Sequence, residues 1–486
     1  MNTEIVDGHT HLFNVGFLPV EGIIVSQYPH PKTAHRVAWL CRKLVEQKYK
    51  RSMDPHIAVV NTELRKPMTV RTPDEPDLIA RFVRAIPDDV MEELAELTRE
   101  LASDAEFLRD ETRQESLRRL GGRMAGDAYE NERLLIDQLL RGAGVPASAR
   151  LEERLGIEGW DWKRLIEWLI LLLQHERRLL EAMADAWSPK PEFKLAVHHM
   201  MDMDPHYVSK GQYPSLYPFA SEQLKRMQAV AKYAGFPVVG FVAYSPFRSD
   251  SLSVIQKARS MGLLGVKFYP PSGYRPIGNT EADIDPASGV SAAEVDERNR
   301  VLFEYCVKND VPIFTHCSSE GMQRFPDKYS GCFSAPQGWA NVLGAPEFES
   351  LRLCLGHAGG EAEWLADPSS PGTTNHCGVD FVPTVVDLCI SRPNVYCDFG
   401  YFDGLFKKPE TIPWFVARLE AAVARSGGAF ARKMCFGTDW HLVAREHNAP
   451  AYVRDFRSII TGSSVLVPYV NDIMIDNALR FLGVAP

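Results

Sequence analysis

Short apolar runs recur along the chain, and longer stretches with a helical spacing of apolar and charged residues separate them. Eight of these runs are rich in β-branched and aromatic residues and are bounded by Gly, Pro, Asp or Asn, which is typical of buried strands. They cover residues 4–9, 194–200, 237–244, 263–269, 311–316, 351–357, 394–400 and 433–438. Strands that alternate with helices, such as the helical pattern at 294–310, predict βαβ units and a parallel sheet. Eight such units predict an α/β fold of the (β/α)8 TIM-barrel type.

One interval breaks this rhythm. About 185 residues separate His9 from Lys194, whereas the later strands start about 40 residues apart. The interval is mostly charged amphipathic helix, whose charged faces are expected to be solvated. We therefore predict a barrel made of residues 1–76 and 188–486, with residues 77–187 forming a helical insertion after the first strand.

The helical pattern at 161–187 carries an apolar stripe that needs an apolar partner. The stripe consists of Leu165, Leu169, Leu172 and Leu173. That partner can be the other helices of the segment, the barrel or a second subunit. A lid over the barrel mouth would exclude water and select substrates by shape, whereas a contact between subunits would do neither directly. We expect a cap beside the mouth that also contributes to a homodimer, so the protein is expected to be a homo-oligomer.

Composition narrows the class of protein. Of the 486 residues, 45% are hydrophobic and 24% are charged, which is ordinary for a globular protein. The net charge of −9 and a pI near 5.9 leave no basic footprint, so we expect no nucleic acid partner. The N-terminus lacks a cationic stretch before an apolar run, so no signal peptide is expected. The longest apolar run, at 169–173, is far shorter than the ~20 residues of a membrane span, so we expect no membrane association.

The nine cysteines include no CxxC pair. Cys354, Cys397 and Cys435 lie inside strand-like runs, where buried free thiols in a reducing compartment are the expected state. We therefore expect a cytoplasmic protein rather than one with a redox or zinc-thiolate role for these cysteines.

Candidate chemistry begins at the end of the first strand, in the run DGHTH. His9 and His11 are two residues apart, so in extended chain their side chains point to the same face. Two imidazoles placed in this way can converge on one divalent ion. An HxH pair alone is weak evidence, but this pair lies at the C-terminal end of a barrel strand, where barrel active sites are built.

Four later strands carry further polar residues at the same end. Lys267 lies in GVKFYP, His316 ends VPIFTH, His357 ends LRLCLGH and Asp439 follows KMCFGT. Each alone has an ordinary structural explanation, such as a hydrogen-bonded core histidine, an N-capping aspartate or a lysine that reaches solvent. Together they gather imidazole and carboxylate groups, which suit zinc, with manganese or iron as the weaker alternatives. The motifs of serine hydrolases, phosphate-binding loops and HExxH helices do not occur in the sequence.

This ordered set of residues resembles the amidohydrolase superfamily of metal-dependent barrels, and in particular its amidohydrolase-related branch. Shared features are HAGG after the sixth strand, PNVYCDFGYF at the seventh, FGTDW at the eighth and the closing NALRFLGV. The resemblance covers residues 1–13 and about 192–486, and not the insertion.

The resemblance implies a ligand set for the metal. In a one-metal site the ligands would be His9, His11, His316 and Asp439. In a two-metal site a carboxylated Lys267 would bridge the ions, and His316 and His357 would bind the second. An unmodified lysine beside a single ion is the alternative, so one or two divalent ions remain open.

The same resemblance implies a hydrolase. A zinc-activated water would cleave an amide, lactone or other ester-like bond of a small carboxylated or cyclic substrate. Asp439 would move the proton of that water, and His357 would stabilise the oxyanion where it is not a metal ligand. The branch also contains decarboxylases and hydratases of aromatic or unsaturated acids, which is the alternative reaction at the same site. The alternative from another class is a barrel that has lost activity and serves as a binding or scaffold protein. In such a protein we would not expect all of the polar strand-end residues to be retained.

Residues beyond the strand ends are candidates for binding the substrate. Arg248 and Arg275 can clamp a substrate carboxylate bidentately, or they can be ordinary surface arginines. Tyr269 and Trp440 can line an apolar pocket or pack against the barrel rim. His198 and His199 at the end of the second strand face opposite sides, so at most one of them points into the barrel mouth. We take His198 as the candidate for binding the substrate.

Overall fold

The computed structural model of the chain divides into two units. The residues that it describes are 3–27, 35, 38–39, 41–43, 171–172, 176–232, 237–324, 329–367, 375–444, 446 and 449–484. The first unit comprises residues 1–13, 176–207 and 217–486, and the second comprises 14–175 and 208–216. The predicted insertion, 77–187, lies outside the described residues except for 171–172 and 176–187. Residues 176–187 group with the first unit.

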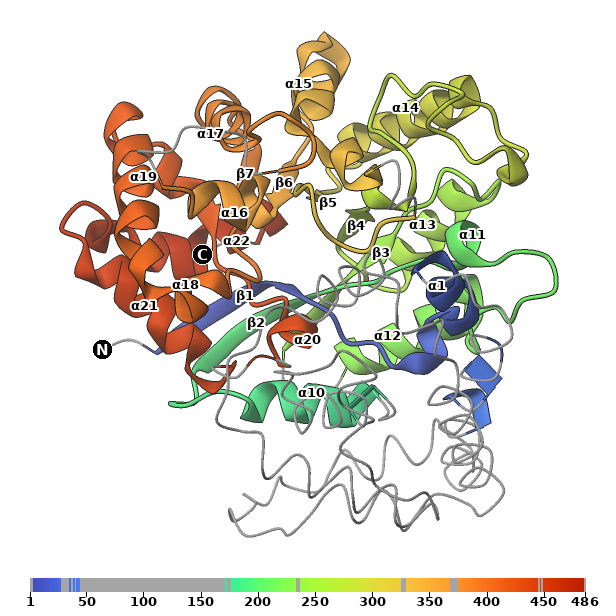
Figure 1. The fold of residues 1–486 in the computed structure, drawn as a ribbon, viewed down its shortest axis with the longest axis horizontal. Coiled ribbons are helices and arrows are strands. Elements are labelled where there is room, and N and C mark those ends of the chain that lie inside the picture. Colours follow the sequence, from blue (N-terminus) through green and yellow to red (C-terminus); the bar gives the residue numbers. More distant parts are fainter. Residues whose placement is uncertain are drawn as a thin grey trace, which may run out of the picture. The chain divides into compact units, whose positions relative to one another are not determined.

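The first unit contains an eight-stranded parallel sheet whose strands follow one another in chain order (Figure 1). The strands are β1 (Glu4–Thr10), β2 (Glu192–His199), β3 (Val238–Ala243), β4 (Gly265–Phe268), β5 (Ile313–His316), β6 (Leu353–Gly356), β7 (Val395–Asp398) and β8 (Met434–Cys435). Gly8 N donates to Phe436 O at 2.9 Å and Asp439 N donates to His9 O at 2.7 Å, which joins β1 to the segment that follows β8. The sheet is therefore a nearly closed barrel, and the predicted α/β TIM-barrel fold with its eight strands is confirmed.

Helices follow each strand in the sequence, and in space they surround the sheet (Figure 1). The longer ones are α10 (Glu176–Asp185), α12 (Leu224–Ala231), α13 (Ser251–Ser260), α14 (Ala292–Lys308), α15 (Pro336–Gly344), α17 (Val382–Ser391), α19 (Ile412–Arg425), α21 (Tyr452–Gly462) and α22 (Asn477–Leu482). The single-turn helices are α11 (Asp204–Tyr207), α16 (Glu361–Trp364), α18 (Gly404–Lys407) and α20 (Trp440–Val443). The helix predicted at 294–310 is α14, which begins after Ser291 because that hydroxyl accepts a hydrogen bond from Glu294 N at 3.2 Å.

The core lies on both faces of the strands. Every residue of β4 to β8 is buried, as expected for parallel strands covered by side chains inside and by helices outside. Between sheet and helices, the Trp339 ring lies 5.1 Å from Phe268 and 5.3 Å from Phe303, measured between centroids. Burial of each such side chain stabilises the fold by about 1.5–3 kcal/mol, so packing against the helices holds the strand ends in place.

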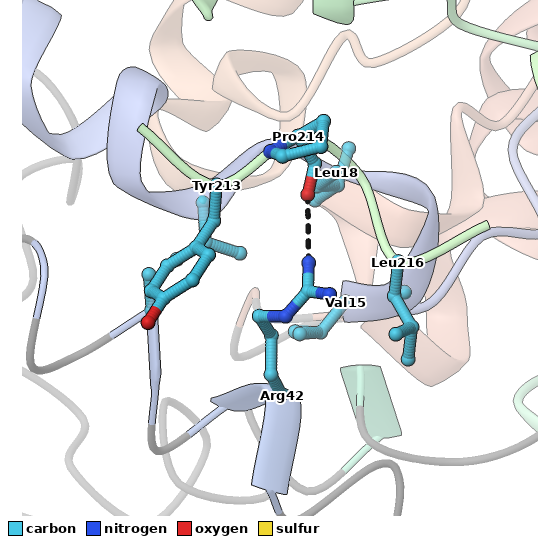
Figure 2. Close-up of a pocket in the computed structure, with 9 residues that line it drawn as sticks. Val15, Leu18, Arg42, Tyr213, Pro214 and Leu216 are labelled. Atoms are coloured by element: carbon cyan, nitrogen blue, oxygen red, sulfur yellow. Dashed lines mark hydrogen bonds between the residues drawn. The ribbon is translucent and has the colours of Figure 1, made fainter. Parts of the chain in front are cut away.

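The second unit contains α1 (Val20–Gln27) and a small pocket (Figure 2). The pocket is lined mainly by apolar side chains, namely Val15, Leu18, Val20, Ala38 and Leu216, together with Gly16, Arg42, Tyr213 and Pro214. Arg42 Nη1 donates to Pro214 O at 2.9 Å, and its guanidinium lies 5.1 Å from the centre of the Tyr213 ring. All of the predicted site residues belong to the first unit, so this pocket contains none of them.

The cysteines are mostly buried free thiols. Cys354, Cys397 and Cys435 are free and buried, as expected from their place in strands. Cys332 and Cys377 form a disulfide, with 5.5 Å between their Cα atoms, which was not predicted from the sequence.

Among the helices that the structure describes, none is long and apolar enough to cross a membrane.

Candidate functional site

Three predicted ligands converge at the C-terminal end of β1. His9, His11 and Asp439 each offer one ligand atom, and these atoms all lie within 4.8 Å of one another. All three residues are buried or nearly so, and within the described part of the chain they are the one such group of histidine, cysteine and acidic side chains. His11 Nε2 lies 3.7 Å from Asp439 Oδ1. The HxH pair and the carboxylate after β8 therefore lie close together, and their role as metal ligands stays a prediction.

Hydrogen bonds fix which ring nitrogen each of these histidines offers. His11 Nδ1 lies 2.7 Å from the carbonyl oxygen of His199, and His9 Nδ1 lies 3.1 Å from Asp398 Oδ2. Carbonyl and carboxylate oxygens only accept, so the proton of each neutral imidazole is on Nδ1 and the lone pair is on Nε2. Histidine ligands of metals show this arrangement. The donor set therefore fits a divalent ion.

Lys267 and two further histidines surround this group. Lys267 Nζ lies 3.5 Å from His9 Nε2 and 4.4 Å from the centre of the Phe314 ring. The His357 ring centre lies 4.8 Å from that of His9 and 4.6 Å from that of His316. All six strand-end residues are thus in one place.

His316 differs from the HxH pair in its hydrogen bonding. Its Nε2 donates to the carbonyl oxygen of Glu320 at 2.9 Å, which leaves the lone pair on Nδ1. His316 is also outside the group whose ligand atoms lie within 4.8 Å of one another. Its role as fourth ligand therefore stays a prediction.

Burial controls the charge of the site. Desolvation, followed by the nearby Lys267, holds the pKa of His9 and His11 well below the usual range, so both are neutral and able to ligate at pH 7. Desolvation also lowers the pKa of Lys267 to about 8, although Asp439 and Asp398 oppose it.

Backbone conformation at two strand ends is unusual. His357 and Asp439 both have positive φ, 61° and 49°, as does Ala358 at 48°. Side chains rarely adopt this left-handed conformation, and the cost of order 1–3 kcal/mol each is typical of functional positions. His357 directly follows β6, and Asp439 lies in the segment after β8, so the left-handed turns occur where the chain leaves these two strands.

Sequence reasoning missed three buried residues that support the site. Asp7 accepts from Thr438 N and Thr438 Oγ1 at 2.9 and 2.6 Å, which fixes the residue before Asp439. Asp398 contacts His9, and His199 supplies the carbonyl to which His11 is bonded. A signal for two of them was present, because Asp7 and Asp398 also lie in or at the end of strands, in VDGH and YCDFG.

The predicted substrate-binding residues fall into two sets. Tyr269 is close to the site, since its ring centre lies 5.0 Å from that of His316 and its hydroxyl accepts from Met322 N at 2.8 Å. Trp440 is buried directly after Asp439, and His198 Nδ1 accepts from Leu12 N at 2.9 Å.

The two arginines already have carboxylate partners within the chain. Arg248 donates to both oxygens of Asp202, and Arg275 donates to both oxygens of Asp283 at 3.3 Å. These bidentate pairs use the guanidinium edges that a substrate carboxylate would need. The clamp therefore stays a prediction that requires the pairs to open.

The chain was compared with curated proteins and with solved structures. No curated protein matches the chain. The solved structures that it resembles include 2,6-dihydroxybenzoate decarboxylase from Rhizobium, at 14% identity over 67% of this chain and 93% of that one, with a TM-score of 0.40. They also include 5-carboxyvanillate decarboxylase from Novosphingobium aromaticivorans with bound manganese, at 12% identity over 74% and 99%, with a TM-score of 0.42. A third is an amidohydrolase from Burkholderia multivorans with bound zinc, at 11% identity over 63% and 87%, with a TM-score of 0.37.

The sequence itself assigns the family. The sequence model of the amidohydrolase family matches residues 173–484, which is more than half of the 486 residues. That stretch contains β2 to β8 and four of the six strand-end residues, Lys267, His316, His357 and Asp439. The chain therefore belongs to the amidohydrolase family.

Proposed function

We propose that the protein is a metal-dependent hydrolase that cleaves an amide, lactone or other ester-like bond of a small carboxylated or cyclic substrate. The observation that carries this proposal is the convergence of His9, His11 and Asp439 within 4.8 Å, with the Nε2 lone pairs of both histidines available. Two imidazoles and a carboxylate are a ligand set of catalytic zinc sites, which have three protein ligands and one open position.

The residues around this site divide the work of hydrolysis. A divalent ion held by His9, His11 and Asp439 would lower the pKa of a bound water toward 7 and polarise the scissile carbonyl. Asp439 accepts the proton of the attacking water at a carboxylate oxygen and delivers it to the leaving group. His9 and Asp439 are buried and the His11 side chain is 12% exposed, so little bulk water reaches these groups and their attraction for developing charge is stronger.

The hydrogen bonding of His357 bears on its proposed role as an oxyanion donor. Its Nδ1 donates to the carbonyl oxygen of Gly400 at 2.9 Å, so the neutral ring carries its lone pair on Nε2. Burial lowers its pKa, which favours that neutral form. A hydrogen bond to an oxyanion needs a proton on Nε2, so we propose that His357 acts as a proton acceptor or as a ligand instead.

We propose zinc as the ion, with manganese as the alternative, because imidazole and carboxylate donors suit both. The group of three ligands accounts for one ion. A second ion needs Lys267 as a carbamate, which forms when the neutral amine attacks carbon dioxide and loses a proton. The lowered pKa of Lys267 makes the neutral amine accessible near pH 8.

Decarboxylation or hydration of an aromatic or unsaturated acid is the second candidate. It would need only the one ion that the group of His9, His11 and Asp439 can hold. Release of carbon dioxide from carboxylated aromatic acids separates it from hydrolysis of lactones and amides.

The decisive experiment measures bound metal. We expect purified protein to contain one to two divalent ions per chain, and His9→Ala combined with His11→Ala to remove them while the far-ultraviolet circular dichroism is unchanged. His206→Gln is the matched control, because His206 is also buried but its ring packs on Tyr274, at 5.9 Å between centroids, and not on the three ligands. Full metal content in the double variant would refute the proposed site.

A further inference from the structure

Asp398 connects three strand ends through one buried carboxylate. It is the last residue of β7 and has no exposed surface. Its Oδ2 accepts from His9 Nδ1 at 3.1 Å and from Gly400 N at 3.0 Å, and its Oδ1 accepts from His357 N at 2.8 Å. An imidazole on β1 and the backbone of the residue after β6 are therefore held by the same side chain.

Both neighbours of the His9 ring require the same position for its proton. A carboxylate oxygen can only accept, so the proton lies on Nδ1, which faces Asp398. On the other side of the ring, Lys267 Nζ lies 3.5 Å from Nε2, and an ammonium group can only donate. The two contacts agree, and Nε2 is left as the atom with the lone pair.

Two glycines leave the space that the pair occupies. A Cβ atom at Gly400 would lie 2.7 Å from His9 Nδ1 and 2.8 Å from Asp398 Oδ2. A Cβ atom at Gly437 would lie 2.4 Å from Asp398 Oδ2 and 2.6 Å from His9 Cβ. Contacts below 3.0 Å are not tolerated, so side chains at either position would push the imidazole and the carboxylate apart. The backbone after β7 and after β8 is thus fitted to this hydrogen bond.

We propose that Asp398 is a positioning residue that fixes the tautomer and orientation of the His9 ring, so that Nε2 can bind a metal ion. The consequence for metal affinity rests on the proposed function, whereas the tautomer itself does not. Asp398 is not one of the three proposed ligands, and it acts on the site through His9. Loss of such a partner of a histidine ligand typically lowers metal affinity 10–100-fold.

The test is Asp398→Asn, which keeps the shape and removes one acceptor. The backbone N–H groups of His357 and Gly400 donate to different oxygens of Asp398, so either orientation of the amide leaves one of them facing its nitrogen. With the nitrogen toward Gly400 it also faces His9 Nδ1, and the imidazole must move its proton to Nε2; with the nitrogen toward His357, Nδ1 keeps its proton but donates to a neutral oxygen instead of a carboxylate. We expect long-range ¹H–¹⁵N spectra of metal-free protein with ¹⁵N-labelled histidine to show either a proton on Nε2 or a shifted Nδ1 signal, with the His9 signals assigned from His9→Gln. We expect Zn²⁺ affinity, measured against a chelating dye, to fall 10–100-fold.

Asp7→Asn is the matched control. Asp7 is equally buried and also accepts hydrogen bonds beside His9, but from the backbone N–H groups of Thr438 and His9 and from the Thr438 hydroxyl. The hydroxyl can rotate to accept from an asparagine, so this variant also removes a buried carboxylate but leaves the His9 proton on Nδ1.

The outcomes separate the two proposals. An unchanged tautomer and unchanged Zn²⁺ affinity in Asp398→Asn would overturn the role of Asp398. If that variant does not fold, the wild-type spectrum still decides, because a proton on His9 Nε2 in the wild type would overturn it as well. A wild-type protein with Nδ1 protonated that binds no divalent ion would support the tautomer control and refute the proposed metal-dependent function.

Discussion

Replacing Arg248 by Met should destabilise the protein in a way that depends on pH. Arg248 and Asp202 form a bidentate ion pair in which the Asp202 side chain is 2% exposed and the Arg248 side chain is 23% exposed. Methionine keeps most of the apolar length of the arginine but leaves the carboxyl group without its cation. A buried carboxylate that loses its partner escapes the desolvation cost by taking up a proton.

The size of the effect follows from the pKa of Asp202. Burial raises that pKa from 3.8 to about 6, although Arg248 opposes the rise, and the charges of Asp204 and Asp250 add to it. Without Arg248 the pKa of Asp202 rises further, and the largest effect follows if the folded variant stays protonated up to pH 8, where the wild type is ionised. Holding a carboxyl group protonated costs about 1.4 kcal/mol for each pH unit above the wild-type pKa. Relative to the wild type, the unfolding free energy of the variant should therefore be almost unchanged at pH 5.5, lower by about 1.4 kcal/mol at pH 7 and lower by about 2.7 kcal/mol at pH 8.

The sign follows from proton binding. A folded pKa above that of the unfolded chain means that the folded state binds more protons, so its stability falls as pH rises. In the wild type this fall ends near pH 6, whereas in Arg248→Met it continues. Urea unfolding followed by circular dichroism at pH 5.5, 7 and 8 measures the difference, and Arg248→Met with Asp202→Asn should remove its pH dependence. A difference in unfolding free energy that is the same at all three pH values would refute the reasoning.

Two further predictions concern the mechanism and the buried histidines. Asp439→Asn keeps the size of the side chain but removes the basic oxygen, so kcat should fall 10²–10⁴-fold while substrate still binds, and a rate within tenfold of wild type would assign the base to another group. His206 is buried, and desolvation lowers its pKa from 6.5 to about 3, so it opposes folding as pH falls from about 6.5 toward 3. Between pH 7 and pH 5 the wild type should lose about 2 kcal/mol more unfolding free energy than His206→Gln, as measured by urea unfolding, and equal losses would contradict the effect of burial.

The fold could be predicted from the sequence because each strand is short, apolar and bounded by turn residues. All eight predicted runs contain a strand, and helix α14 begins within two residues of its prediction. Parallel strands that are buried on both faces have near-continuous apolar runs, and this makes them visible without any knowledge of their neighbours. The structure describes too little of 77–187 to test the insertion.

From the sequence, only the site residues at the ends of strands could be predicted, and their hydrogen-bond partners could not. His9, His11 and Asp439 are recognisable because chemistry in barrels lies where strands end. Asp398 lies at a strand end too, but nothing in its local sequence shows that its partner is an imidazole on a strand 389 residues away. The pairing of Arg248 with Asp202 is equally invisible, because the ends of β2 and β3 become neighbours only in the folded barrel.

The disulfide has a consequence for redesign of the barrel mouth. Cys332 lies in the connection that follows β5 and His316, and Cys377 lies in the connection that follows β6 and His357. Loop exchange is a common way to alter what a barrel enzyme accepts, and it assumes that each connection is an independent module. Here a disulfide joins the connections after β5 and β6. A graft that replaces only one of them therefore leaves one cysteine unpaired and removes the crosslink from the other connection. Libraries for this protein should vary the two connections together and keep both cysteines.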